Sequence, residues 1–410
     1  MVFGDGVIRL YPSRDSYYQN GTHYISGMFG FCSKLQSVSI GSGVSDVPEY
    51  FMFDVGNAED KLSISFGGQI GRVGYYAINN GNVTNLSMTL ANCVIDSYAF
   101  SCCPASLDNL DFTQIKSIGE RAFSGCIGLT FVRTSRLLTS IGQYAFYDCS
   151  SLVEAEIDGT NLSLERSAGL FKNCRNLRGV KFGDGVTRLY PSRDSYYQNG
   201  THYISGMFGF CSNLQSVSIG SGVSDVPEYF MFDVGNAEDK LFVSFGGQIG
   251  RVGYYALNNS NITNMNITLV NCAVDSYAFS GCSAVTLKSV DFSQVKSTGE
   301  RAFQNCRNII GDMSLSLATS IGQHAFSGCT GLASAKFGSS LTSIGQYAFS
   351  GCTNASSFAF ASAPPSVGSS VFSNVKKGAR GYYTAVNAAA WEAVIDSKGY
   401  WNGLKMKPSY

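Results

Sequence analysis

The sequence lacks an excess of charge of either sign: its 410 residues include 29 acidic and 29 basic side chains, and only 14% are charged. A neutral chain has no long-range field to attract nucleic acid or anionic lipid, so we expect neither partner. Long apolar runs are also missing, because no stretch approaches the ~18 residues that a membrane-spanning helix needs. We therefore expect no membrane insertion.

Histidine is nearly absent, with three residues in the whole chain. None of the motifs G-x-S-x-G, H-E-x-x-H, G-x-x-x-x-G-K or G-x-G-x-x-G is present. A nucleophilic side chain would therefore rarely find a base beside it. We expect no enzymatic activity, no catalytic residues and no cofactor.

Metal ligands are equally sparse, because the chain has no C-x-x-C or Cys/His cluster at the spacing that zinc requires. Two acidic loops offer oxygen ligands for calcium, Asp54, Glu59 and Asp60 in one and Asp233, Glu238 and Asp239 in the other. We favour solvated loops over calcium sites and expect no metal centre.

What the sequence has in abundance is repetition. The segment that begins at Lys181 nearly reproduces the one that begins at Val2, an offset of 179 residues. A shorter unit lies inside each copy: Cys103, Cys126 and Cys149 are spaced 23 residues apart, and fifteen such units can be counted. Units of this size cannot bury their own apolar side, so they stack into a solenoid.

Each unit has two halves with different periodicities. Leu35, Val38 and Ile40 show the L-x-x-L-x-L spacing of a short strand. Ile141, Ala145, Phe146 and Cys149 recur at i, i+4, i+5 and i+8, which favours a short helix. The sequence thus predicts an α/β fold, a right-handed leucine-rich-repeat solenoid of about fifteen units.

Repeats of the form L-x-x-V-x-I…V-T-S-I-G-x-x-A-F-x-x-C resemble the BspA-like leucine-rich repeats of bacterial surface proteins. The resemblance covers nearly the whole chain. It implies a non-enzymatic adhesin-like module that binds host or neighbouring-cell proteins, since members of the family are linked to matrix proteins such as fibronectin and fibrinogen. It also implies an extracellular or cell-surface location, with the signal and the anchor outside this chain.

The repeats set the expected domain organisation. Residues 1–179 form the first copy of a tandem duplication, residues 180–375 the second copy, and residues 376–410 a capping segment, all in one continuous solenoid. The cap carries both tryptophans, Trp391 and Trp401. An alanine-rich helix around Asn387 to Val394 would place Trp391 against the last unit.

The cysteines follow the repeat. Ten of the thirteen share one position after the A-F dipeptide, where we expect a buried column of small apolar side chains. Cys93, Cys102 and Cys272 lie outside this column. An occasional disulfide among them is left open.

Two tyrosine-rich insertions give the strongest functional signal. They span Tyr11 to Tyr24 and Tyr190 to Tyr203. Their rigid aromatic rings, arginines and small polar residues resemble the composition of protein-binding surfaces. The candidate ligand-binding residues are Arg14, Tyr17, Tyr18, His23, Tyr24, Arg193, Tyr196, Tyr197, His202 and Tyr203. The alternative interpretation is that these rings only fold the insertion back onto the solenoid.

The sequence therefore favours recognition of a host or bacterial surface or matrix protein through the concave sheet and the inserted loops. Two other functions stay open. Sugars also stack on aromatic rings, so the array can be a glycan-binding module. It can equally be a structural spacer with no ligand of its own.

Overall fold

The computed structural model describes most of the chain, which divides into two compact units. The described residues are 1–7, 9–10, 15–19, 22–26, 28–29, 32, 34–53, 61–79, 83–190, 194–198, 201–231, 234, 241–258, 262–283 and 290–409. Unit 1 comprises Met1–Tyr190 and Asp194–Gly222, and unit 2 comprises Pro191–Arg193 and Val223–Tyr410. Each unit taken by itself is a solenoid of stacked parallel strands, and one turn of the solenoid is here called a coil.

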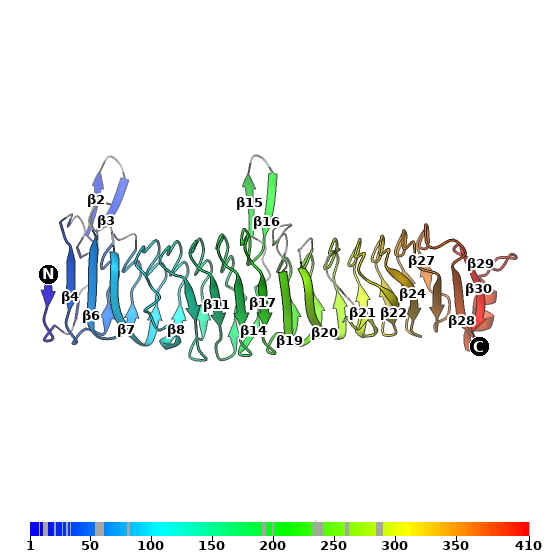
Figure 1. Cartoon of the computed structure of the whole chain (residues 1–410), viewed down its shortest axis with the longest axis horizontal. Coiled ribbons are helices and arrows are strands. Elements are labelled where there is room, and N and C mark those ends of the chain that lie inside the picture. Colours follow the sequence, from blue (N-terminus) through cyan, green and yellow to red (C-terminus); the bar gives the residue numbers. More distant parts are fainter. Residues whose placement is uncertain are drawn as a thin grey trace. The chain divides into compact units, whose positions relative to one another are not determined.

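In unit 1 the coils supply strands to two parallel ladders (Figure 1). The first ladder contains β1 (Val2–Phe3), β4 (Ser37–Ile40) and the first halves of β6 (Leu62–Val73) and β7 (Val83–Ile95), followed by β9 (Phe131–Arg133), β11 (Glu154–Ile157), β13 (Gly179–Phe182) and β17 (Ser216–Ile219). The second contains β5 (Asp46–Val47), the second halves of β6 and β7, β8 (Ile115–Ile118) and β10 (Ser140–Ile141), followed by the pair β12 (Leu162–Ser163) and β14 (Val186–Arg188). The 3-10 helix η1 (Phe112–Gln114) precedes β8.

The long strands β6 and β7 run through both ladders. Ser37 is the register partner of Ser63 near the start of β6, and Asp46 is the partner of Arg72 near its end. The register between β6 and β7 shifts between Ser65 and Gln69, as expected where a strand bends. The alternating burial of β4 confirms the period-two strand that the sequence predicts.

Unit 2 repeats this arrangement. Its first ladder contains the first halves of β19 (Leu241–Val252) and β20 (Ile262–Val274), then β22 (Gly311–Leu315), β24 (Leu332–Phe337), β26 (Ser357–Phe360), β28 (Arg380–Thr384), β30 (Leu404–Ser409) and β29 (Tyr400–Trp401). Its second contains β18 (Asp225–Val226), the second halves of β19 and β20, β21 (Val295–Thr298), β23 (Ser320–Ile321), β25 (Ser343–Ile344) and β27 (Ser366–Val367). The 3-10 helices are η3 (Phe292–Gln294) and η4 (Ala385–Asn387).

The expected helical half of each 23-residue repeat is not confirmed. The A-F segments form consecutive tight turns instead, and these turns together are here named the turn wall. In one coil the N–H of Ala99 bonds to the carbonyl of Asp96, and the N–H of Cys103 to that of Phe100. Tyr98 has a left-handed φ of 59°, which a right-handed helix cannot contain. Its N–H bonds instead to the carbonyl of Glu120 in the next coil, at 2.8 Å.

The core of each unit is a stack of phenylalanines from the turn wall. Phe100 and Phe123 lie with ring centroids 5.2 Å apart and planes 5° apart, and Phe146 continues the stack at 5.5 Å. In unit 2 Phe303 and Phe326 repeat the arrangement at 5.2 Å. Stacked aromatic pairs contribute about 0.5–1.5 kcal/mol beyond the area they bury, so the repeated A-F dipeptide stabilises each coil on its neighbour.

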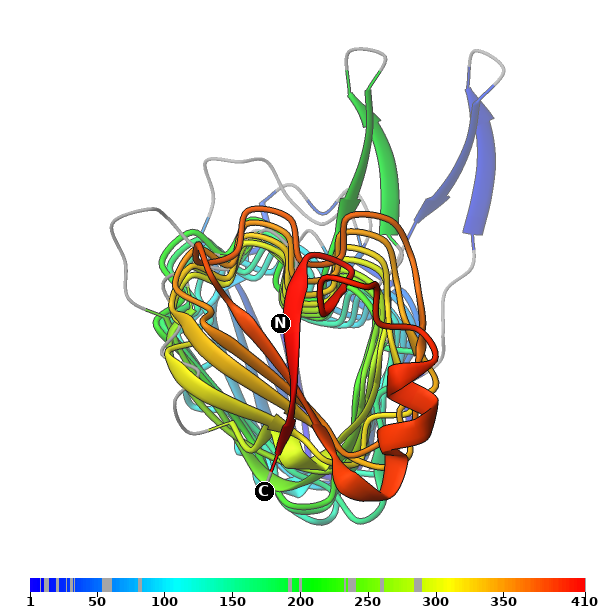
Figure 2. The same ribbon diagram turned by 90° about the vertical axis from the view of Figure 1, so that its right-hand side faces the viewer.

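A tryptophan-rich cap covers the last coil of unit 2 (Figure 2). The helix predicted near Asn387 is present as α1 (Ala388–Glu392). Trp391 is fully buried and its indole N–H donates to the carbonyl of Ser362 at 3.0 Å. Trp401 packs edge-on against Trp391, with centroids 4.9 Å apart.

Candidate binding surfaces

Each tyrosine-rich insertion contains a β-hairpin. In the first, β2 (Asp15–Gln19) pairs antiparallel with β3 (Thr22–Ser26). In the second, β15 (Asp194–Gln198) pairs with β16 (Thr201–Ser205). Among the described residues each hairpin is a two-stranded sheet of its own, with no strand of either ladder joined to it (Figure 1).

The hairpin register brings most of the predicted site residues together in pairs. Tyr17 is opposite Tyr24 and Tyr18 is opposite His23. The second hairpin has the corresponding pairs, Tyr196 with Tyr203 and Tyr197 with His202. The predicted Arg14 and Arg193 lie outside the described residues.

The acidic loops proposed as an alternative calcium site also lie outside the described residues: Asp54, Glu59, Asp60, Asp233, Glu238 and Asp239. Within the described part of the chain no three His, Cys, Asp or Glu residues are placed to hold a metal ion. That same part contains no helix whose length and apolarity would let it cross a membrane.

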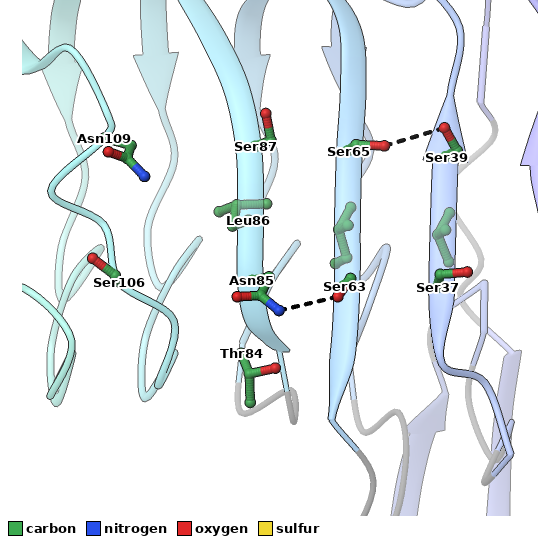
Figure 3. Close-up of a pocket in the computed structure, with 12 residues that line it drawn as sticks. Ser37, Ser39, Ser63, Ser65, Thr84, Asn85, Leu86, Ser87, Ser106 and Asn109 are labelled. Atoms are coloured by element: carbon green, nitrogen blue, oxygen red, sulfur yellow. Dashed lines mark hydrogen bonds between the residues drawn. The ribbon is translucent and has the colours of Figure 1, made fainter.

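A shallow groove of about 350 Å³ lies on the outer face of the first ladder in unit 1 (Figure 3). Its lining is uncharged and rich in hydroxyl and amide groups: Ser37, Val38, Ser39, Ser63, Ile64, Ser65, Thr84, Asn85, Leu86, Ser87, Ser106 and Asn109. The hydroxyls of Ser39 and Ser65 are 3.1 Å apart, and the Asn85 amide donates to the Ser63 hydroxyl at 3.2 Å. Hydroxyls both donate and accept, so this groove suits a neutral polar ligand.

The sequence prediction named the sheet as a binding face but did not single out these serines. The available signal was the Ser-x-Ser alternation, as in Ser37 and Ser39, around a buried Val38. Only the register shows that Ser39, Ser65 and Ser87 form one row across three strands.

A column of stacked tyrosines on the turn wall was not predicted. The rings of Tyr50, Tyr76 and Tyr98 lie nearly parallel, with centroids 5.8 and 4.6 Å apart. Partial burial raises the pKa of Tyr76 to about 12, with smaller contributions from Tyr75 and Tyr98. In unit 2 Tyr229, Tyr255 and Tyr277 repeat the stack, and burial raises the pKa of Tyr255 to about 12.

The tyrosine column serves packing more than ligand stacking. The two ring faces of Tyr76 are occupied by Tyr50 and Tyr98, which leaves no free face for a sugar or a base. Tyr76 also adopts a left-handed φ of 50°, a conformation that costs a non-glycine residue about 1–2 kcal/mol. The ring contacts offset this backbone strain.

Nine of the ten column cysteines are buried as predicted, while Cys32 is exposed, and the buried thiols have a second role. The Cys126 thiol donates to the carbonyl oxygen of Phe100 in the preceding coil at 3.0 Å, and Cys149 does the same with Phe123. The same contact joins Cys174, Cys211, Cys306, Cys329 and Cys352 to a phenylalanine carbonyl. Each thiol thus links two coils.

All thirteen cysteines are free thiols. Only Cys32 and Cys102 are exposed. Burial raises the pKa of Cys103 and Cys211 to about 12 and that of Cys126 well above its ordinary value. A buried thiol that stays protonated is a poor nucleophile and a poor metal ligand.

Coils that pair in parallel register, a phenylalanine stack and a turn wall define a leucine-rich-repeat solenoid. The chain belongs to the family described as "BspA type Leucine rich repeat region (6 copies)", whose model matches residues 18–114, 93–198, 204–312 and 313–379. This confirms the family that the repeats resemble. The family is that of a protein-interaction or surface module.

Several solved structures align with most of this chain. A leucine-rich repeat protein from Bacteroides ovatus ATCC 8483 is 19% identical, with 100% of this chain and 92% of that chain covered and a TM-score of 0.45. A leucine rich cell surface protein from Faecalibacterium prausnitzii A2-165 is also 19% identical, with 93% and 97% covered and a TM-score of 0.33. The pneumococcal vaccine antigen PcpA is 11% identical, with 96% and 87% covered and a TM-score of 0.29. No curated protein matches the sequence.

Proposed function

We propose that this chain is a non-enzymatic recognition module of the cell surface, and that its tyrosine-rich hairpins bind a protein on a host or neighbouring cell. The observation that carries the proposal is the separate two-stranded sheet formed by each insertion. An insertion that only completed the core would be expected to add strands to a ladder. In both copies the inserted hairpin is instead a sheet separate from the ladders.

The register of the hairpins supports a binding role. Tyr17 is paired with Tyr24, and Tyr18 with His23, so two adjacent register positions of the hairpin carry aromatic residues on both strands. Tyrosine supplies large contact area with few rotatable bonds, so little conformational entropy is lost on binding. The pairing of the two hairpin strands fixes the backbone of these residues before a partner arrives, which lowers the free-energy cost of association further.

The cysteines support a non-enzymatic role. Nucleophilic catalysis by cysteine needs a thiolate, and burial raises the pKa of Cys103 and Cys211 to about 12, so these thiols stay protonated at neutral pH. His324 stacks on Tyr347 with centroids 5.0 Å apart, and burial lowers its pKa. The family is typically one of interaction modules, in agreement with this view.

Binding of a neutral glycan is the second candidate function, and the serine-rich groove favours it. Ser63, Ser65 and Asn85 offer a flat array of uncharged donors and acceptors. Such groups match the hydroxyls of a neutral sugar. A structural spacer, the third possibility, predicts that neither the hairpins nor the groove binds a ligand.

A pull-down from host-cell surface extract tests the proposal against both alternatives. The variant replaces Tyr17, Tyr18, Tyr196 and Tyr197 with alanine, and the control variant replaces Ser63 and Asn85 with alanine. We expect capture of a protein that the hairpin variant loses and the groove variant keeps. Loss with the groove variant alone, together with saturable binding on a glycan array, would favour the glycan module, and no capture at all would favour the spacer.

A further inference from the structure

The C-terminal strands of unit 2 carry a basic face that the proposed hairpin function does not use. It consists of Lys336 on β24, Arg380 on β28, and Lys405 and Lys407 on β30, all exposed. The register places Arg380 directly opposite Lys405. A second row of register partners runs across the four strands, from Lys336 through Ala359 and Tyr382 to Lys407.

The charge arrangement of this basic face differs from that of unit 1. On the first ladder of unit 1, Arg133 is opposite Glu156, and their side chains form an ion pair at 2.8 Å. On the basic face a cation is opposite a cation, Arg380 against Lys405. Like charges directly opposite each other destabilise a sheet. An anion that binds across such an exposed pair relieves the repulsion between its two cations.

No acidic side chain of the described residues neutralises the basic face through an ion pair. Asp396, in the turn before β29, accepts hydrogen bonds from the backbone N–H groups of Lys398 and Tyr400. Asp312 lies at the far end of the row of register partners that runs through Ser334 and Ser357 to Arg380. It accepts a hydrogen bond from the Ser334 hydroxyl at 2.6 Å. The turn that leads into β28 adds two more exposed cations, Lys376 and Lys377.

Aromatic rings lie among these cations. The Lys405 ammonium is 5.7 Å from the centroid of the Tyr400 ring, and Tyr382 is half-exposed in the row of Lys407. Cations bind carboxylate or sulfate groups, and sugar rings pack against tyrosine. The remaining outward residues of β26 and β28 are small: Ser357, Ala359 and Thr384.

The geometry also argues against a peptide that extends the sheet. β29 pairs with β30 at Leu404 and Lys405, the N–H of Met406 bonds to the carbonyl of Gly399, and Pro408 has no N–H to pair with an added strand. Strand addition needs a free edge. We propose that the basic face binds an anionic polysaccharide that carries carboxylate or sulfate groups at regular intervals along its chain. This site and partner are distinct from the hairpins and their protein ligand.

The test measures binding of the full chain to dextran sulfate, to polygalacturonate and to neutral dextran. The variant carries Arg380→Gln, Lys405→Gln and Lys407→Gln. The matched control carries Lys116→Gln, Lys181→Gln and Lys296→Gln, three exposed strand lysines elsewhere. We expect saturable binding to one or both polyanions and none to dextran. The variant should bind at least about tenfold more weakly, and the control should bind within about threefold of the wild type.

Two further measurements keep the outcome decisive. About 1 M salt, where charges are screened within ~3 Å, should abolish the binding. The variant should melt at the same or a higher temperature, because it removes the repulsion between Arg380 and Lys405. Equal weakening in the control variant would overturn the proposal. So would equal or tighter binding to polyglutamate, duplex DNA or phosphatidylserine vesicles.

Discussion

The thiol of Cys149 donates a hydrogen bond to the main-chain carbonyl oxygen of Phe123, 3.0 Å away in the preceding coil. The same carbonyl accepts the N–H of Cys126, which closes a turn. One oxygen therefore holds both its own turn and the next coil. The recurrent cysteine is thus a link between coils as well as a small core side chain.

Replacing Cys149 by alanine should lower the free energy of unfolding by about 1–2 kcal/mol, because a buried sulfur and its hydrogen bond are both lost. The control is Cys102→Ala on the exposed thiol, which should stay within about 0.5 kcal/mol of the wild type. Urea unfolding followed by circular dichroism measures both. Equal effects of the two substitutions would contradict the role of the column.

Thiol labelling of the native protein should divide the cysteines into two classes. Cys32 and Cys102 are exposed and should react with a thiol reagent within minutes at pH 8. The other eleven thiols are buried, as illustrated by Cys211, whose pKa is raised to about 12, and should react only on unfolding. Mass spectrometry of the labelled peptides identifies them. Rapid labelling of any column cysteine other than Cys32 would show that the coils open in the native state.

The variant Tyr76→Gly should be more stable than the variant Tyr76→Ala. Both substitutions remove the contacts with Tyr50 and Tyr98, but alanine keeps the strain of a left-handed φ, which is 50° at this residue. We expect the alanine variant to be less stable than the glycine variant by about 1 kcal/mol. At Tyr75, which has no left-handed φ, the order should reverse. Thermal unfolding of the four variants decides, and the same order at both positions would refute the explanation.

Alkaline pH should destabilise the fold through Tyr76 and Tyr255. Burial raises the pKa of each to about 12 in the folded chain, against 10.0 for the ordinary side chain. The folded state holds these protons more tightly, so their contribution to stability is complete below pH 10 and is lost as the pH rises from 10 towards 12. The double variant Tyr76→Phe, Tyr255→Phe should lose less of its pH 8 melting temperature by pH 11.5 than the wild type does. Parallel losses would contradict the assignment.

Much of the architecture could be predicted from the sequence, because the period-two alternation and the 23-residue cysteine spacing are local signals. The buried residues of β4 and the phase of Cys149 follow directly from them. The helical prediction failed because a spacing of i, i+4, i+5 and i+8 also fits tight turns repeated every four residues. A left-handed Tyr144, where glycine or asparagine is usual, gives no sign of such a turn.

The candidate sites divide in the same way. The hairpin tyrosines stand out by composition, and a two-stranded pairing of their segments brings Tyr17 opposite Tyr24. The serine groove and the basic face depend on register between strands far apart in the chain. Arg380 and Lys405 are neighbours only because β28 and β30 pair without a shift. No periodicity within one strand indicates that relationship.

The most direct test of the recognition account measures binding to the proteins of a host-cell surface extract together with thermal unfolding. The wild type is compared with the variant in which Tyr17, Tyr18, Tyr196 and Tyr197 are alanine. The hairpins form sheets separate from both ladders. The account therefore predicts saturable binding of the wild type to a protein of the extract, lost in the variant, with melting temperatures that agree within about 2 °C. Unchanged binding in the variant, or a lower melting temperature without a loss of binding, would contradict it.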